Sequence, residues 1–476
     1  MLHLIRHTTT LCLVAAALSI VSHIYAAESD TEALRAEVRA MREAYESRIA
    51  TLEEKVKDLT TNGVQQEKSA DKRVTDAFAK SLPAETGVSY QIAPGANSVR
   101  SSTQVTLGGY TEFTYIDRST RTPQFNQLKT VAELSSRINE KINLYIEAEE
   151  EQGAVIAGPE ATQGEFEIEQ AYIDYTIDKS LNFRAGTTLV PLGHYNLYHE
   201  GFLNNLVDRP LVDRRIIPTT WYEESIGFYG TPIDNDTLGL TYETYMYNPA
   251  ASDGVDPIAG FRGIHNEGKS PDSDQKAGAA RLQFEPARSF KNVADTFEVG
   301  LSTYVSGFSG FKGVNSDGDP VSFPSGRLFI SAADVTWEKK NVGFRGEAAF
   351  AHTDAGENST GKAQSAYGFY AEGYYKFWPC FLNSSPFGKF KDPKLVAAIR
   401  YDYVDLNSQA PATPSISRIT AGISYRPIPR TVFKFDYQYD TLGTGIVGQN
   451  YDEPQDLETG LNKHNHAFLF SCTTGF

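Results

Sequence analysis

Apolar and polar residues alternate with a period of two from residue 103 to the end of the chain. The alternation is clearest over residues 431–440, and residues 395–403 and 342–350 repeat it. In the first of these, aromatic residues occupy one face and polar residues the other: Phe433, Phe435, Tyr437 and Tyr439 against Lys434, Asp436, Gln438 and Asp440. Because side chains of a β-strand point alternately to opposite faces, this pattern predicts strands with one apolar and one polar face.

Such strands fit two all-β folds, a soluble sandwich or an antiparallel transmembrane β-barrel whose apolar face meets lipid and whose polar face lines water. Three features favour the barrel. The exported chain has a net charge of −16 and little aliphatic core, and it ends in Phe476 after an alternating strand with Phe468 and Phe470, which resembles the signal read by the outer membrane barrel insertion machinery. Aromatic residues also gather at expected strand ends, as interfacial girdles do: Tyr110, Tyr115, Tyr172, Tyr175, Trp221, Trp337, Tyr375 and Trp378.

Short and long connections alternate along the barrel region. The long ones, expected to face outward, cover residues 191–222, 248–276, 307–325, 353–364, 404–415 and 441–463. Bacterial single-chain barrels have an even number of strands, and residues 129–150 decide the parity. A strand to about Ile138, a turn at 139–141 and a strand from Ile142 to Glu150 give about sixteen strands, whereas the apolar spacing of the same piece also fits a helix.

The N-terminal residues predict export and a separate helical unit. Residues 1–26 have the charged start and apolar centre of a secretory signal peptide, with cleavage expected after Ala26. Residues 27–62 carry a heptad-like apolar seam with charged outer faces, which favours an oligomeric coiled coil over a single helix packed on the barrel. Residues 63–102 are expected to be a linker, and residues 103–476 the barrel. No later run of about 18 apolar residues is present, which excludes helical membrane spans beyond the leader.

Residues 191–223 have neither a strand nor a helix period, although they are rich in large apolar side chains. A long ordered loop of this kind is usually functional, so we expect it to fold into the barrel mouth and constrict it. It also contains His194, His199 and Glu200. Metal binding by the two histidines would need a third ligand that the sequence does not supply, so a structural or lumen-lining role is favoured and no metal site is predicted.

The same loop carries a charged cluster. If it enters the lumen, Arg209, Arg214 and Arg215 would offer bidentate hydrogen-bond donors to phosphate, carboxylate or sulfate. Alternatively, Asp208 and Asp213 pair with these arginines and pin the loop. Both arrangements fit a constriction, which needs some charges tied down and others exposed.

The predicted inner wall carries charges of both signs. The lumen-facing set expected from the alternation is Arg184, Arg345, Glu347, Arg400, Asp402, Lys434 and Asp436. Two acidic groups are expected to meet across the second outer loop: Glu147, Glu149, Glu150 and Glu151 with Glu165, Glu167 and Glu169. They would bind divalent cations or simply make the vestibule acidic, which would oppose the entry of anions.

Several functions find no support in the sequence. The acidic balance argues against nucleic acid as a partner, and no hydrolase, P-loop or Rossmann motif is present, so neither an enzyme nor a cofactor is expected. Cys380 and Cys472 are the cysteines beyond the leader, and free thiols are favoured over a bond between them.

Residues 167–230 resemble the phosphate-selective porin O/P type. The resemblance is carried by a strand ending in AYIDY, the following RAGTTLVPLG strand and the charged loop. The N-terminal heptads resemble the periplasmic coil of DcaP-like trimeric porins. The resemblance implies a homotrimeric diffusion channel. Counting strands back from Phe476 places about five strands before residues 191–223, so this loop is expected to be the third outer loop. In general porins the third outer loop is the one that folds into the lumen.

We therefore expect an outer membrane porin of a Gram-negative bacterium that passes small polar or anionic solutes such as phosphate or carboxylates. Its expected partners are other copies of the chain, outer membrane lipids and the barrel assembly machinery, with the coiled coil in the periplasm. A plugged barrel that tethers the envelope through its coil is the alternative. A barrel hydrolase is disfavoured because no nucleophile–base pair is evident.

Overall fold

The described part of the chain forms one closed antiparallel sheet. The computed structural model describes residues 88–90, 104–120, 122–151, 165–251, 255, 260–265, 275–286, 293–308, 311–314, 320–323, 326–354, 364–412, 414–447 and 462–476. The expected signal peptide and coiled coil lie outside these residues. Within the described ranges no helix is long and apolar enough to cross a bilayer.

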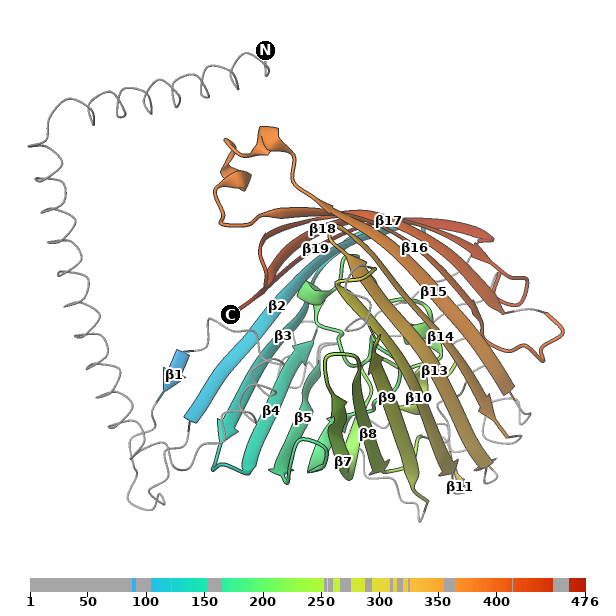
Figure 1. Ribbon diagram of the computed structural model, residues 1–476. Coiled ribbons are helices and arrows are strands. Elements are labelled where there is room, and N and C mark those ends of the chain that lie inside the picture. Colours follow the sequence, from blue (N-terminus) through green and yellow to red (C-terminus); the bar gives the residue numbers. More distant parts are fainter. Residues whose placement is uncertain are drawn as a thin grey trace, which may run out of the picture. The chain divides into compact units, whose positions relative to one another are not determined.

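Sixteen strands make the wall, since the seventeen-stranded sheet includes the short β1 (Val88–Tyr90), which pairs only with the start of β2. Each wall strand pairs with its neighbours along the chain, and β19 pairs with β2 to close the ring (Figure 1). The wall strands are β2 (Gln104–Arg118), β3 (Gln124–Arg137), β4 (Ile142–Glu151), β5 (Glu165–Thr176), β6 (Asn182–Leu189), β7 (Tyr222–Asp234), β8 (Gly239–Tyr247), β9 (Ala277–Glu285), β10 (Thr296–Phe308), β13 (Gly326–Lys339), β14 (Val342–Thr353), β15 (Gln364–Phe377), β16 (Lys394–Asp405), β17 (Ser415–Ile428), β18 (Thr431–Leu442) and β19 (His464–Gly475).

The ambiguous piece at residues 129–150 is a strand, a turn and a strand. At the turn, the Asn139 side-chain oxygen accepts hydrogen bonds from the backbone N–H groups of Lys141 and Ile142, at 2.8 and 2.9 Å. This side-chain cap fixes a tight reversal between β3 and β4. The strand prediction and the even strand number are therefore confirmed, and the helical alternative is wrong.

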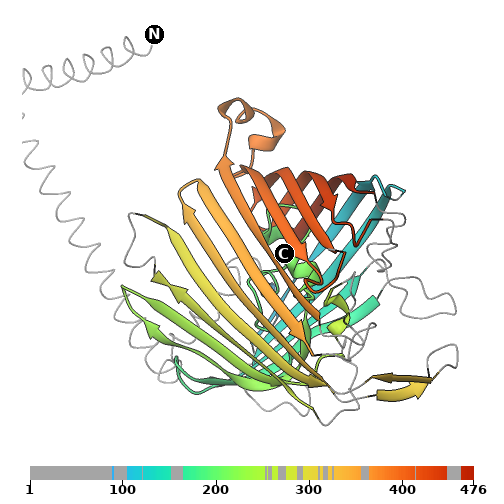
Figure 2. The same cartoon turned by 90° about the vertical axis from the view of Figure 1, so that its right-hand side faces the viewer.

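Long and short connections lie at opposite ends of the barrel. The six segments expected to be long all connect strands at one end, which we call the long-loop end; one of them carries a hairpin of β11 (Phe311–Val314) and β12 (Pro320–Phe323), visible in Figure 2. The other end, the short-turn end, has tight turns such as 340–341 and 429–430. A longer connection at this end is residues 378–393, which contain the short helices η4 (Cys380–Leu382) and η5 (Pro386–Gly388) and which the sequence pattern did not reveal.

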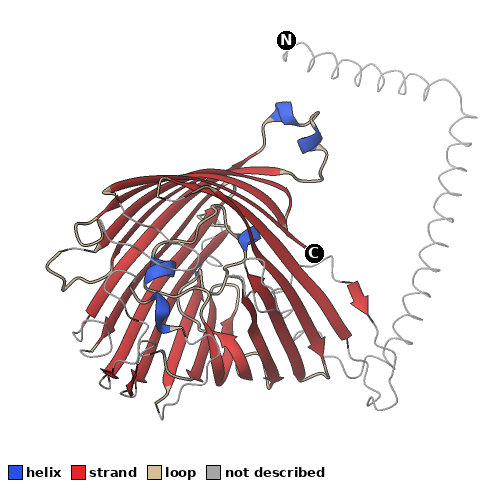
Figure 3. Ribbon diagram, turned by 180° about the vertical axis from the view of Figure 1, so that it is seen from behind, coloured by secondary structure: helices blue, strands red, loops and turns tan. Residues whose placement is uncertain are grey.

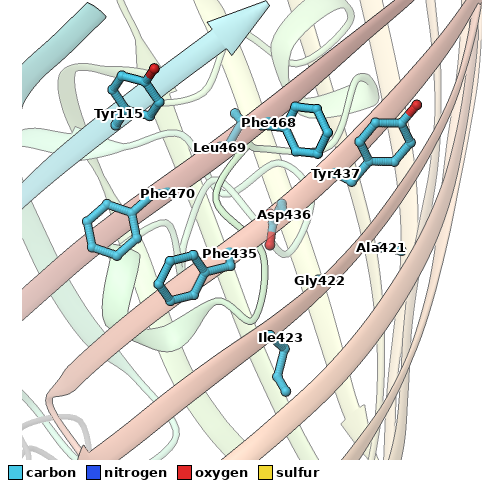
Figure 4. Close-up of a pocket in the computed structure, with 10 residues that line it drawn as sticks. All are labelled: Tyr115, Ala421, Gly422, Ile423, Phe435, Asp436, Tyr437, Phe468, Leu469 and Phe470. Atoms are coloured by element: carbon cyan, nitrogen blue, oxygen red, sulfur yellow. The ribbon is translucent and has the colours of Figure 1, made fainter.

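Alternate residues of each strand face opposite environments, as the pleat requires. On β18, Phe435 is 56% exposed on the outside while its neighbour Asp436 is 4% exposed on the inside, and Figure 4 shows the two side chains pointing to opposite sides of the strand. Aromatic rings around Ala421 border a shallow outer groove of about 610 Å³. An apolar exterior over a closed sheet is the surface of a barrel that is immersed in lipid.

The interior is filled by two of the long connections and by inward-facing wall side chains. Figure 3 shows short helices and loops lying within the ring of strands. The largest buried apolar cluster joins Trp221 and Ile216 of the first connection, Phe261 of the second, and Tyr304 and Tyr370 of the wall. Cys380 lies in the segment 378–393 and Cys472 on β19, and the two are separate thiols.

Candidate functional site

The loop between β6 and β7, residues 190–221, crosses the barrel interior. It joins the fifth and sixth wall strands, as the strand count predicted. Its base is closed by Asn196, which is completely buried. The Asn196 amide group donates to the carbonyls of Val190 and Trp221 at 2.8 and 3.1 Å, and its oxygen accepts from the Trp221 N–H at 2.8 Å. One side chain thus clasps both ends of the loop, and the predicted constriction segment starts and ends at this clasp.

From this base the loop reaches the opposite wall, where charged side chains satisfy its backbone. Arg400 on β16 donates to the carbonyls of Asp208 and Arg209, at 3.0 and 3.3 Å. Two residues further along the same strand, Asp402 accepts the backbone N–H of Leu211 at 3.0 Å. A cation on the wall therefore meets a loop carbonyl, and the adjacent inward-facing anion meets a loop N–H.

The same arrangement recurs on β14 and β18, the strands two before and two after β16. Arg345 and Lys434 donate to the carbonyls of Leu203 and Leu206, at 3.3 and 3.2 Å. Their i+2 neighbours are Glu347, which accepts the His194 N–H at 2.8 Å, and Asp436, which accepts the Val207 N–H at 2.6 Å. Three alternate strands thus each contribute a cation and an anion to the loop.

These pairs include six of the seven wall residues expected to face the lumen. The seventh, Arg184 on β6, lies apart from the loop in a bidentate pair with Asp174, at 2.7 and 3.0 Å. Sequence reasoning missed Arg426 on β17, which donates to the carbonyls of Phe202 and Asn204. The cation–x–anion spacing marks the other three strands but not Arg426, which is followed by Pro427 and Ile428 and lies at a shift in strand register.

Asp208 is the charged centre of the loop. Its carboxylate lies 2.6 Å from Arg118 of β2, 3.3 Å from Arg418 of β17 and 3.9 Å from Arg214 of the loop itself. Burial alone would raise the pKa of Asp208, but the guanidinium of Arg118, followed by those of Arg214 and Arg418, outweighs burial and holds it well below its usual value. Arg418 is in turn fixed by Asp440. Asp208 therefore remains ionised and joins the loop to two distant strands.

The three loop arginines have different surroundings. Arg209 donates to the carbonyl of Thr219 and to the hydroxyl of Thr220, so it braces the loop internally. Arg215 is buried in the short helix α4 (Val212–Arg215). Arg214 has 15% of its side chain accessible, and Arg209 is likewise partly exposed. The expected set of three anion donors is therefore divided: Arg209 and Arg214 are partly exposed, and Arg215 is buried.

Asp213 does not take part in an ion pair among the described residues. Its side chain is fully buried near Glu347, and both carboxyl oxygens lack a hydrogen-bond partner. Burial and the charge of Glu347 raise the pKa of Asp213 well above its usual value, which favours the uncharged acid. The expectation that both aspartates pair with the loop arginines is met by Asp208 with Arg214 and not by Asp213.

The two histidines of the loop have separate partners. The Nε2 atom of His199 lies 3.4 Å from Glu169 of β5, and its Nδ1 atom lies 3.2 Å from the Asn196 carbonyl oxygen. His194 packs on Tyr198 with 4.6 Å between ring centroids, and burial lowers the pKa of His194 to about 4. Glu200 precedes η1 (Gly201–Leu203), and its carbonyl accepts the Leu203 N–H. Among the described residues, His, Cys, Asp and Glu side chains form no group that could hold a metal ion.

The acidic residues expected near the second outer loop line the wall on β4 and β5. Glu149 and Glu167 are cross-strand partners. Lys129 of β3 lies 2.8 Å from Glu149 and 4.0 Å from Glu151, so part of this negative charge is neutralised. The interior therefore has an acidic side on β4 and β5, whereas β14 to β18 carry inward cations and anions together.

Comparisons with known proteins give the following likenesses. No family model matches the chain. An uncharacterized protein of Aquifex aeolicus (strain VF5) is 27% identical over 354 residues, which span 70% of this chain and 75% of that protein. Solved structures with a similar fold include the anion-selective porin from Comamonas acidovorans, 8% identical with a TM-score of 0.49 over 79% of this chain and 100% of that one. Another is the outer membrane channel DcaP of Acinetobacter baumannii, 9% identical with a TM-score of 0.45 over 79% of this chain and 97% of that one. With TM-scores below 0.5, these likenesses add nothing to what the strands of this chain show.

Removing the charge of Asp208 is expected to release the loop. Asp208→Asn leaves Arg118, Arg214 and Arg418 without their shared anion, and breaking one partner of a buried ion pair costs about 3 kcal/mol. At 1.4 kcal/mol per factor of ten, the population of the open loop should rise about a hundredfold. Trypsin cleavage after Arg214 or Arg215 in vesicle-inserted protein measures that population, since the Arg209–Pro210 bond is not a trypsin site.

The matched control is Asp440→Asn, which removes a carboxylate from the same Arg418 without touching the loop. It should leave the cleavage rate close to that of the parent protein. Equal cleavage of the two variants would show that Asp208 does not hold the loop.

A second prediction tests how closely the loop tip approaches the wall. Gly422 faces inward on β17, and a Cβ atom there would collide with the Asp436 carboxylate and come within 2.7 Å of the Leu206 side chain. Gly422→Val should push the tip away, because overpacking of this kind costs about 1–3 kcal/mol. Hydrogen exchange at the Val207 amide should accelerate by about tenfold or more. Gly373→Val is the control, since that position has no atom within 4 Å of a Cβ; unchanged exchange in Gly422→Val would place the tip farther from β17.

Proposed function

We propose that the chain is an outer membrane diffusion channel for small polar solutes, with residues 190–221 as its constriction. The observation that carries the proposal is the crossing loop, held by cation–anion pairs from three wall strands. Barrels of 16 to 18 strands are wide enough to leave an aqueous channel, so a loop folded inside sets the effective width. Non-helical backbone at membrane depth is tolerated where it is buried in protein or lines water, and this loop meets that condition.

The proposed location is the outer membrane of a Gram-negative bacterium, with the short-turn end in the periplasm. The apolar exterior of the closed sheet supports insertion into a bilayer. The proposed assembly is a homotrimer inserted by the barrel assembly machinery, with the expected coil at residues 27–62 in the periplasm. The resemblance to phosphate-selective O/P porins and DcaP-like porins supports this assembly.

The solute class we propose is small anions, including phosphate and carboxylates. Arg214 supports this choice because it belongs to the constriction cluster and 15% of its side chain is accessible. Many other cations of this wall hold loop carbonyls and so contribute field without offering free donor groups. The acidic side on β4 and β5 favours cations. Selectivity is therefore set by the balance between this acidic side and the cations of the loop and the opposite wall.

The selectivity prediction separates the three loop arginines. In a planar bilayer under a tenfold salt gradient, Arg214→Ala should move the reversal potential toward cation preference by a measurable part of the roughly 59 mV ideal limit. Arg209→Ala should instead loosen the loop and increase current fluctuations, because Arg209 braces the Thr219 carbonyl. An identical reversal potential in parent and Arg214→Ala would show that this side chain does not face the ion path. A parent protein that conducts no current would sink the channel proposal.

The filled interior supports a second candidate function, a plugged barrel that tethers the envelope through the N-terminal coil. The apolar cluster around Trp221, Phe261 and Tyr304 joins both inward loops to the wall, which favours a closed interior. Deleting residues 28–62 distinguishes the candidates. If the protein is a tether, the envelope should detach in cells that carry the deletion, and the parent protein should conduct no current in bilayers. If it is a channel, the protein should conduct with or without the deletion.

A further inference from the structure

Residues 378–393, which we call the rim lobe, form a folded unit at the short-turn end. The lobe joins β15 to β16 and projects beyond their ends (Figures 1 and 2). Two short helical turns pack on each other: a Cβ at Gly388 would come within 2.8 Å of the Asn383 Cα atom. The Trp378 indole N–H donates to the Asn383 side chain at 2.8 Å, and the Ser385 hydroxyl donates to the Leu382 carbonyl at 2.7 Å. The lobe therefore holds its own shape.

This rigid unit presents large apolar rings outward. Phe381 is 78% exposed, Phe387 56% and Phe390 45%. An ordered surface that displays several phenylalanines within ten residues marks a contact with an apolar partner or a membrane. The tight turns 340–341 and 429–430, described at the same end of the barrel, are too short to form such a unit.

The lobe rests on the outer, lipid-facing side of the wall and not on the lumen. Its anchor is Tyr425, which occupies an outward position of β17 next to Phe433. The Tyr425 hydroxyl donates to the Phe387 carbonyl at 2.6 Å, and its ring packs against the rings of Phe387 and Trp378, at 5.6 and 6.1 Å. The exposed phenylalanines therefore continue the apolar exterior at the level where the wall leaves the bilayer.

Cationic side chains accompany these rings. Lys389 and Lys391 are exposed, and neither has an ion pair within the described ranges, whereas Lys394 pairs with Asp392 at 2.9 Å. Two unpaired lysines beside three exposed phenylalanines stand out in a chain whose net charge is −16. Aromatic rings with adjacent lysines are the composition of segments that lie in a membrane interface.

We propose that the rim lobe binds anionic phospholipid, with Phe381 and Phe390 in the bilayer interface and Lys389 and Lys391 on the headgroup phosphates. The proposal rests on the membrane location given under the proposed function. Its occupant is lipid and not protein, because the lobe adjoins the lipid-facing wall through Tyr425 and adds positive charge at the bilayer surface. The lobe would fix the vertical position of the barrel, since interfacial rings and lysines resist displacement in both directions.

The test uses Phe381→Trp in the full-length protein, inserted into vesicles that contain brominated phosphatidylglycerol or brominated phosphatidylcholine at equal mole fraction. The parent protein, whose Trp378 lies in the lobe itself, is measured in each lipid, and its signal is subtracted from that of Phe381→Trp in the same lipid. We expect quenching of the new tryptophan by both lipids, with a preference for phosphatidylglycerol of up to about fivefold per lysine at low salt. Lys389→Gln with Lys391→Gln should abolish the preference and retain the quenching.

Lys179→Gln with Lys340→Gln is the matched control, because these lysines are exposed on tight turns of the same barrel end. This control should keep the preference. The proposal is overturned if neither lipid quenches the tryptophan of Phe381→Trp. It is also overturned if the two lipids quench this tryptophan equally while Lys389 and Lys391 are both present. Conductance of the same vesicles is recorded in parallel: a conducting protein with an unquenched lobe refutes the lobe proposal alone, and a silent protein with a quenched lobe refutes the channel alone.

Discussion

The backbone of an aperiodic loop inside a barrel needs hydrogen-bond partners, and the rest of this structure depends on how that need is met. A strand satisfies its N–H and C=O groups through its neighbours, but residues 190–221 have no neighbouring strand. An unsatisfied buried backbone group costs free energy comparable to a lost hydrogen bond. Here the partners are inward-facing charged side chains of the wall, supplied as cation–anion pairs such as Arg400 and Asp402.

This solution changes the meaning of the charged wall. A lumen lined by charged side chains of both signs suggests a surface that passes ions. Here, however, Arg345, Arg400 and Lys434 donate hydrogen bonds to loop carbonyls. Hydrogen bonds to charged groups are stronger than those between neutral groups, which suits a loop without regular structure. These three wall cations therefore serve first to hold the loop in place.

The sequence was sufficient for the wall because strand alternation is a local pattern. Strand number, the position of the crossing loop and the lumen-facing set, Asp402 and Asp436 among it, followed from the period of two. The partners of the loop did not follow, because Asp208 meets Arg418 across 210 residues of chain and no local pattern records that distance. The rim lobe was missed because Trp378 was assigned to the interfacial girdle, and residues 378–393 were not recognised as a connection.

The clasp at Asn196 and the wall pairs together impose an order on assembly. The loop leaves the wall after β6, but the strands that satisfy its backbone, β14 to β18, come more than a hundred residues later. Until those strands arrive, the loop must stay hydrated inside an incomplete sheet. We therefore expect the last wall strands to pair at the same time as the loop backbone exchanges water for its wall partners. Barrel closure and the final shape of the interior then form in a single cooperative step.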